Sequence, residues 1–246
     1  MNVYTKTDIG LVRTENQDTV WGEMLSENAC AAVLCDGMGG ESDGGLASKI
    51  AVDIISSRIK ESFSELMNRN SVRNLLVTAV IAANSIVFGE SQKRAERAVM
   101  GTTCVAAIVS GGVAYIVNVG DSRAYHVFST ETDDCIRQIT KDHSRVQDLL
   151  DRGKITPEEA KNHPNINIIT RAIGADDSVT PDYFEVDLEE GQRLLLCSDG
   201  LSAHGDDMDI MDIVTYTKPE EACDGLIRYA LTNGGSDNIS VALITL

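Results

Sequence analysis

The chain has 246 residues, of which 43% are hydrophobic, enough to build one substantial core in a single domain over residues 1–246. Its formal net charge of −17 disfavours binding to nucleic acid or to anionic membranes. No uninterrupted apolar run approaches the roughly 18 residues of a membrane helix, and the N-terminus lacks the apolar core of a signal peptide. We expect a cytoplasmic protein that acts as a monomer.

The six cysteines form no C-x-x-C pair, and several lie inside apolar runs such as Ala29–Cys35 and Leu194–Cys197. A free buried cysteine behaves as a small hydrophobic residue. We therefore expect reduced core cysteines rather than disulfides or zinc ligands.

The N-terminal part of the chain predicts three strands followed by two helices. The strands are Val3–Thr7, Thr19–Met24 and Ala29–Cys35, the last of which runs into Asp36-Gly37-Met38-Gly39-Gly40. Apolar residues then recur with helical spacing over residues 43–63 and again over residues 71–88.

The rest of the chain predicts hairpins, a polar segment and two more helices. Strands are expected at Thr102–Val109, Val113–Val119, Arg123–Phe128, Cys135–Ile139, Tyr183–Val186, Arg193–Cys197 and Ile239–Thr245. Residues 144–165 are polar, with short helical stretches and little periodicity, and two longer helices are expected at Asp207–Thr215 and Pro219–Leu231. Consecutive hairpins favour antiparallel sheets, and strands that are apolar throughout need both faces buried. An α+β fold of two stacked sheets covered by helices meets both demands.

Acidic residues recur where the predicted strands begin or end. Four of them are Asp36, Asp121, Asp199 and Asp237, and a fifth, Asp18, precedes the second strand. Taken singly, an Asp-Gly pair is typical of a turn, because both residues accept turn dihedrals. Several carboxylates at one edge of a sheet would repel one another unless cations lay between them. Ligands that offer only oxygen suit Mg²⁺ or Mn²⁺, so the joint pattern favours a two-metal hydrolase over a set of ordinary turns.

Eight motifs in a fixed order extend this pattern over the chain. They are Arg13-x-x-Asn16-Gln17-Asp18, Asp36-Gly37-Met38-Gly39-Gly40, Gly101-Thr102-Thr103, Gly120-Asp121-Ser122-Arg123, Asp142-His143-Ser144, Thr170-Arg171-Ala172-Ile173-Gly174, Ser198-Asp199-Gly200-Leu201 and Asp237-Asn238. Together they resemble the bacterial type 2C metal-dependent serine/threonine protein phosphatases, from about Asp8 to Leu246. The resemblance implies a four-layer αββα sandwich, in which two stacked, mainly antiparallel sheets are flanked by pairs of helices.

The resemblance also implies ligands for two core metal ions, Mn²⁺ or Mg²⁺. Asp36 resembles the carboxylate that bridges both ions, and Asp199 and Asp237 resemble ligands of the first. Asp18 resembles the partner of the second ion, mostly through bound water, together with the backbone carbonyl of Gly37. A water that bridges two such ions loses a proton near neutral pH and attacks phosphorus directly, so no covalent phospho-enzyme is expected.

A weaker third ion and a phosphate-binding group complete the implied site. Asp121, with Asp199, is similar to the pair that holds the third ion, and Asn238 resembles a residue that holds water behind the ligands. Arg13 has the planar fork that binds two phosphate oxygens, although by itself it would be taken for one half of a surface salt bridge. The catalytic set is therefore Arg13, Asp36 and Asp199.

Two features depart from the family pattern or leave a choice open. Met38 and Glu41 stand where relatives carry histidine, so the acid that protonates the leaving group is unassigned, with a metal-bound water near Asp121 as one candidate. Residues 145–165 match the position of a mobile flap that helps to choose substrates, and a plain surface excursion is an equal alternative.

The implied activity is hydrolysis of phosphoserine and phosphothreonine in proteins, opposing a serine/threonine kinase. The expected partners are phosphorylated proteins, including such a kinase and its substrates. Two alternatives share the same residues: a pseudo-enzyme that binds phosphoproteins without turnover, and a metal-dependent hydrolase of small phosphoesters or nucleotides.

Overall fold

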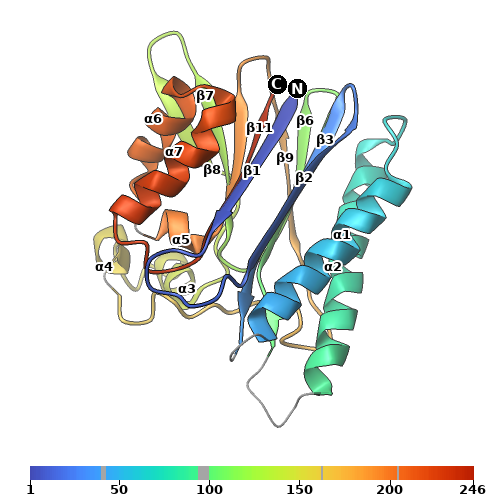
Figure 1. Ribbon diagram of the computed structural model, residues 1–246, viewed down its shortest axis with the longest axis vertical. Helices are drawn as coiled ribbons and strands as arrows, with labels where there is room; N and C mark the ends of the chain where they lie inside the picture. Colours follow the sequence, from blue (N-terminus) through green and yellow to red (C-terminus); the bar gives the residue numbers. More distant parts are fainter. Residues whose placement is uncertain (40–42, 94–99, 162, 204) are drawn as a thin grey trace.

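The computed structural model describes residues 1–39, 43–93, 100–161, 163–203 and 205–246. Two β-sheets pack face to face, and a pair of long helices covers each outer face (Figure 1). The predicted α+β four-layer sandwich is confirmed. Both chain termini lie at one end of the sandwich, and the loop between the first two strands lies at the other end (Figure 1).

The first sheet has five antiparallel strands in the order β1-β11-β10-β7-β8. Their bounds are β1 Asn2–Asp8, β7 Arg123–Ser129, β8 Asp134–Gln138, β10 Arg193–Cys197 and β11 Ile239–Thr245. Helices α6 (Asp207–Tyr216) and α7 (Pro219–Thr232) bury Ile210, Val214 and Leu226 against its outer face.

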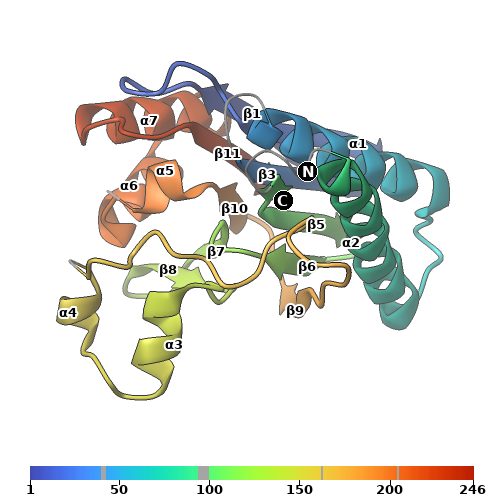
Figure 2. The ribbon, with the colours of Figure 1, turned by 90° about the horizontal axis from the view of Figure 1, so that it is seen from below.

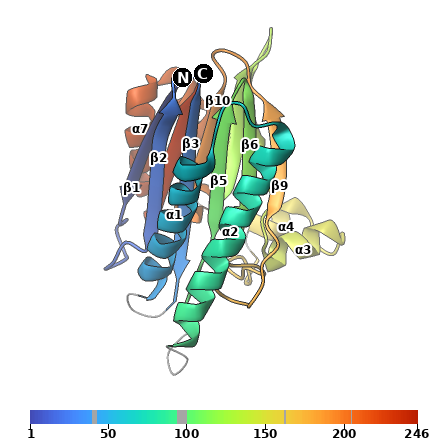
Figure 3. The ribbon, with the colours of Figure 1, turned by 90° about the vertical axis from the view of Figure 1, so that its right-hand side faces the viewer.

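The second sheet follows the order β2-β3-β5-β6-β9, with the short β4 paired to β3. The bounds are β2 Asp18–Ser26, β3 Ala29–Met38, β4 Gly101–Thr102, β5 Cys104–Ser110, β6 Val113–Val119 and β9 Asp182–Asp187. Helices α1 (Asp43–Ser62) and α2 (Arg69–Gln92) cover its outer face (Figure 3).

Side chains point alternately to the two faces of each strand, so neighbouring residues belong to two different hydrophobic cores. In β3, Leu34 points into the core between the sheets, while its neighbour Val33 packs under α1 and α2. All seven residues of β6 are buried for the same reason. Burial on both faces explains why these strands are apolar throughout and rich in β-branched residues.

Helix α2 is the one described helix that is long and apolar enough, by length and composition alone, to cross a membrane. It is a core helix here, because Val72, Leu76, Val80 and Val87 are buried in the layer that it shares with α1 and the second sheet. The six cysteines are free; five are buried and Cys135 is half-buried, as expected of reduced residues.

Three local features differ from the prediction, although most predicted elements agree to within a few residues. Strand β3 does not stop at Cys35 but continues through Asp36 and Gly37. The run predicted at residues 102–109 is interrupted at Thr103, and a one-turn helix, α5 (Asp199–Ser202), follows β10 directly.

The short helical stretches predicted in the polar, weakly periodic segment are confirmed as two short helices, α3 (Arg145–Asp151) and α4 (Pro157–Lys161). Figure 2 shows both helices projecting from the sandwich, and Figures 1 and 3 show them toward the same end as the loop between β1 and β2. This places the segment beside the strand ends that carry the acidic residues.

Candidate active site

The predicted site residues gather at one end of the sandwich, around a cavity of about 800 Å³. Its lining includes Arg13, Asp36, Gly37, Asp121, Asp199, Asp237 and Asn238. Asp18 lies behind this lining, where it is buried and is the cross-strand partner of Asp36. Residues that are distant in sequence therefore meet at one edge, as the strand-end pattern predicts.

The backbone of Asp36 is held by the two threonines of the Gly101-Thr102-Thr103 motif. Its N–H donates to Thr103 Oγ1 at 3.0 Å, and its carbonyl accepts from Thr103 N and from Thr102 Oγ1, both at 2.8 Å. Thr103 Oγ1 also shares a 2.7 Å hydrogen bond with Ser122 Oγ. The interruption between β4 and β5 thus lets a threonine side chain fix the strand that carries the central carboxylate.

The glycines after Asp36 and Asp199 are required by close approach of neighbouring backbone, not by turn dihedrals. Gly37 lies within β3, and a Cβ built there would lie 2.1 Å from the carbonyl oxygen of Gly44. A Cβ on Gly200 would lie 2.0 Å from the carbonyl oxygen of Asn238. Interpreting these Asp-Gly pairs as ordinary turns is therefore wrong: each glycine lets another segment pack directly against the acidic residue.

The carboxylate of Asp18, in the second sheet, accepts a hydrogen bond from a residue at the end of a strand of the first sheet. Ser198 Oγ donates to Asp18 Oδ2 at 2.8 Å and accepts from the N–H of Ser240 at 2.9 Å. This hydrogen bond crosses from the end of β10 to the start of β2, so it ties the two sheets together directly beneath the cavity.

Arg13 lies in the loop between β1 and β2, with about half of its side chain exposed. Its Nη2 donates to Asp237 Oδ2 at 2.6 Å, which brings the guanidinium to the rim of the cavity. Asn238 holds the same loop: its side-chain oxygen accepts from Gln17 N at 2.8 Å, and its Nδ2 donates to the carbonyls of Ile9 and Glu15 at 2.9 and 3.0 Å. The water-holding role of Asn238 stays a prediction, but its amide has a visible role as the anchor of the Arg13 loop.

Crowding of the carboxylates changes their acidity. Burial, followed by the charges of Asp18, Asp199, Asp121 and Asp237, raises the pKa of Asp36 well above its usual range. Burial also raises the pKa of Asp18 and of Asp121 to about 7, although hydrogen bonds from Ser240 and Ser198 partly offset the effect at Asp18. Each shift has the same cause: anions held together in a poorly solvated place. Cations at this edge would remove the repulsion.

Comparison with known proteins identifies the family. The family model described as protein phosphatase 2C matches residues 12–243. The chain is similar to the protein phosphatase PhpP of Streptococcus pneumoniae, with 37% identity over 247 residues, covering 100% of this chain and 98% of that protein. It is also similar to the solved structure of the S. agalactiae serine/threonine phosphatase, with a TM-score of 0.91, 33% identity and coverage of 100% and 99% of the two chains.

This chain belongs to the protein phosphatase 2C family. A further similar structure is that of the catalytic domain of the serine/threonine protein phosphatase PstP in complex with two manganese ions. It has a TM-score of 0.83 and 33% identity, and the match covers 98% of this chain and 96% of that one. Members of this phosphatase family depend on metal ions, so the acidic edge of the present chain is the place to test for them.

The residues of this family member fit hard divalent cations in their chemistry. The donors around the cavity are oxygens, and in the described residues Asp18 Oδ1 is buried without a hydrogen-bond partner. An oxygen set with an unsatisfied buried carboxylate suits Mg²⁺ or Mn²⁺, which also retain several waters. Within the described ranges, no three acidic, histidine or cysteine side chains come together tightly enough to enclose one ion. The assignment of particular ligands to particular ions therefore stays a prediction.

Sequence patterns missed several residues that shape this phosphatase site. Thr103 and Ser198 lie inside family motifs, so their position was a usable signal, although their hydrogen bonds were not foreseen. Ile166 and Asn167 line the cavity from the α3–α4 side, and nothing in their spacing indicated it. Met38 also lines the cavity, whereas Glu41 lies outside the described residues.

Proposed function

We propose that this protein hydrolyses phosphoserine and phosphothreonine in other proteins, using Mn²⁺ or Mg²⁺ at the acidic edge. The proposal rests on one observation: four strand-end aspartates and the guanidinium of Arg13 line the same cavity. A fifth aspartate, Asp18, lies directly behind this lining. Anionic groups bind cations there, and Arg13 supplies the positive charge that a phosphate needs in a chain of net charge −17.

Each residue has a distinct task in the proposed reaction. Asp36, Asp199 and Asp237 would hold the first ion, and Asp36 would share the second with Asp18 and the carbonyl of Gly37. Two such ions, when bound, supply an activated water and neutralise charge on the phosphate. The forked guanidinium of Arg13 orients two phosphate oxygens, and its loop is held in place by the amide of Asn238.

Two finer parts of the proposal concern a third ion and the leaving group. We infer that Asp121, together with Asp199, holds a weaker third ion, since both line the cavity and since burial, followed by the charge of Asp199, raises the pKa of Asp121. The oxygen of serine or threonine must receive a proton as the ester bond breaks, and Met38 beside the site cannot donate one. Water on the Asp121 side is the proposed donor.

The biological setting follows from the proposed chemistry. Phosphorylated proteins are the substrates, and a serine/threonine kinase is the enzyme that the phosphatase opposes. We propose that the protein acts in the cytoplasm as a monomer, and that residues 145–165 form a flap that contacts substrates. The free buried cysteines support the proposal of a reducing compartment. Ile166 and Asn167, which follow α4 and line the cavity, support the proposal of a flap.

Phosphate release tests the proposal directly. The purified protein should release phosphate from p-nitrophenyl phosphate and from a phosphothreonine peptide when Mn²⁺ or Mg²⁺ is added, and chelation by EDTA should abolish both reactions. A folded, metal-loaded protein that binds the peptide and releases no phosphate would be a pseudo-enzyme instead. A specificity constant that is higher for nucleotides than for phosphopeptides would favour a hydrolase of small phosphoesters.

A further inference from the structure

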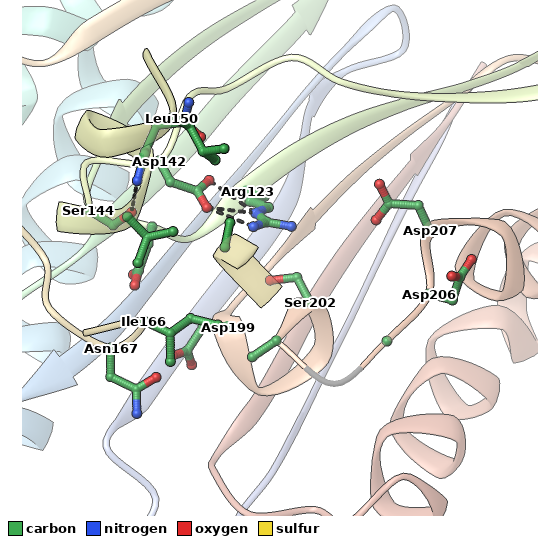
Figure 4. A pocket seen from close by; sticks show the side chains of 16 residues that line it. Arg123, Asp142, Ser144, Leu150, Ile166, Asn167, Asp199, Ser202, Asp206 and Asp207 are labelled. Atoms are coloured by element: carbon green, nitrogen blue, oxygen red, sulfur yellow. Dashed lines mark hydrogen bonds and ion pairs between the residues drawn. The ribbon is translucent and has the colours of Figure 1, made fainter. Parts of the chain in front are cut away.

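A second cavity, of about 530 Å³, adjoins the site on the side of α3 and α5 (Figure 4). We call it the side cavity. It shares Asp121, Asp199 and Ile166 with the first cavity, so the two cavities meet at these residues. Of its remaining lining, Val146, Gln147 and Leu150 belong to the proposed flap, whereas Asp206 and Asp207 have no task in the reaction proposed above.

One wall of the side cavity is apolar and the opposite wall is acidic. Val146 and Leu150 on α3 and Ile166 after α4 supply aliphatic surface. Asp206 and Asp207, at the start of α6, supply two exposed carboxylates. Figure 4 shows Asp207 projecting from α6 toward the side where Arg123 and Asp142 lie.

The other charged residues of the side cavity either form an ion pair with each other or are proposed metal ligands. Asp142 accepts from Arg123 Nη2 at 2.7 Å and from its Nε at 3.0 and 3.1 Å, so these two charges cancel (Figure 4). Asp121 and Asp199 belong to the proposed metal centre. The carboxylates of Asp206 and Asp207 remain: Asp206 Oδ1 caps α6 by accepting from Met208 N at 2.9 Å, and Asp207 forms no hydrogen bond or ion pair with the described residues.

Aliphatic surface that ends in uncompensated carboxylates matches one kind of side chain. Lysine and arginine bury a long apolar stem and keep a charged head near anions or water. An extended peptide advances about 3.3 Å per residue, so a side chain within roughly three residues of a phosphorylated one lies near enough to enter an adjoining cavity. Acidic side chains would be repelled by the same walls.

We propose that the side cavity is a subsite for a lysine or arginine of the substrate, close in sequence to the phosphorylated serine or threonine. The inference rests on the proposed phosphatase function and adds the substrate class: phosphoproteins with a basic residue near the phosphate. The stem lies along Val146, Leu150 and Ile166, and the charged head faces Asp206 and Asp207.

Matched phosphothreonine peptides test the subsite. Each peptide carries arginine, glutamine or glutamate at one test position. The test position is varied from three residues before the phosphothreonine to three residues after it. Both kcat/KM and Kd (by fluorescence anisotropy) are measured for each peptide. At one or two positions we expect arginine to exceed glutamine by about fivefold, the range of one or two exposed ion pairs, and glutamate to be the poorest.

Two double variants with the same change of charge provide the comparison. Asp206→Asn with Asp207→Asn should reduce the arginine-to-glutamine ratio to about one, since asparagine still caps α6. Asp212→Asn with Glu220→Gln alters exposed acids on α6 and α7 that do not line the cavity, and should leave the ratio as in the wild type. Asp207→Lys should favour the glutamate peptide. Circular dichroism verifies that each variant is folded.

Each outcome separates the subsite from the phosphatase activity. Equal kcat/KM and Kd for the three peptides at every position, in an enzyme that hydrolyses them, would overturn the subsite alone. Absence of hydrolysis would contradict the proposed function, and the ratios of Kd would still decide the subsite. Loss of a Mn²⁺ site in the Asp206→Asn, Asp207→Asn variant, with the peptide ratio unchanged, would reassign the cavity to a metal ion.

Discussion

The two walls of the active-site cavity are built in different ways. On the sheet side, two threonines hold the backbone of Asp36 and Ser198 holds the carboxylate of Asp18, so both residues are fixed by hydrogen bonds between elements. On the facing side, Val146 and Ala160 are the buried residues among those described in the α3–α4 segment, and Ile166 is exposed beside the cavity. We infer that the rigid wall on the sheet side positions the groups that react, whereas the less buried α3–α4 wall determines which substrates fit.

The largest effect should come from removing charge on the rigid wall. Asp36→Asn is expected to lower kcat by about a thousandfold or more, because the central metal ligand is lost. Thermal stability without metal should stay the same or rise, because burial and neighbouring anions already oppose ionisation of this residue. Assays with p-nitrophenyl phosphate and thermal unfolding in EDTA measure both.

A matched control for Asp36→Asn is Asp224→Asn, which removes the same charge from an exposed ion pair with Lys6. Activity close to that of the wild type is expected there. A rate that is undiminished in Asp36→Asn would contradict the metal assignment.

A second comparison uses glycines on the two walls. Gly37→Ala should destabilise the protein by about 2–4 kcal/mol, because its Cβ would overlap the backbone of Gly44 and Gln17. Gly153, between α3 and α4, has a positive φ of +60° but open surroundings, because nothing lies within 4 Å of a Cβ built there. Gly153→Ala should cost only about 1 kcal/mol, from the left-handed backbone. Equal losses in urea unfolding would contradict the contrast between the walls.

Much of this arrangement could be predicted from local patterns. Apolar alternation located the strands, and the recurrence of aspartates at strand ends predicted that Asp36, Asp121, Asp199 and Asp237 would meet. These predictions succeed because burial on both faces of a strand determines the types of adjacent residues, so the strands and their ends can be located from the sequence. The ordered motifs extended them to Arg13.

Other features depend on contacts between segments that are distant in the sequence, and the pattern of neighbouring residues does not predict such contacts. The glycine after Asp36 looks like a turn residue, yet its reason is the backbone of Gly44. The anchoring of the Arg13 loop by Asn238 joins residues more than two hundred positions apart. The α3–α4 segment has little periodicity because few of its described residues are buried. The sequence therefore predicted short helical stretches there, but neither their bounds nor the exposure of Ile166 could be foreseen.

A third change tests whether the Arg13 loop belongs to the rigid wall. Asn238→Ala removes one acceptor and two donors that hold the backbone of the loop at Gln17, Ile9 and Glu15. We expect kcat/KM for p-nitrophenyl phosphate to fall by about 10–100-fold, mainly through KM, since Arg13 would lose its position. Thr232→Ala, at the exposed end of α7, is the control. A rise in KM that also appears in an Arg13→Ala background would contradict action through Arg13.

The smallest expected effect concerns the wall that faces the sheets. Ile166→Ala trims a side chain that borders both cavities, so kcat/KM for a phosphoprotein should fall about three- to tenfold. Ile168→Ala makes the same change on a more exposed side chain, 49% against 38%, that borders neither cavity, and should have no effect. Because p-nitrophenyl phosphate has no polypeptide to contact this wall, a loss with that substrate as large as with the phosphoprotein would mean that Ile166 supports the rigid wall instead.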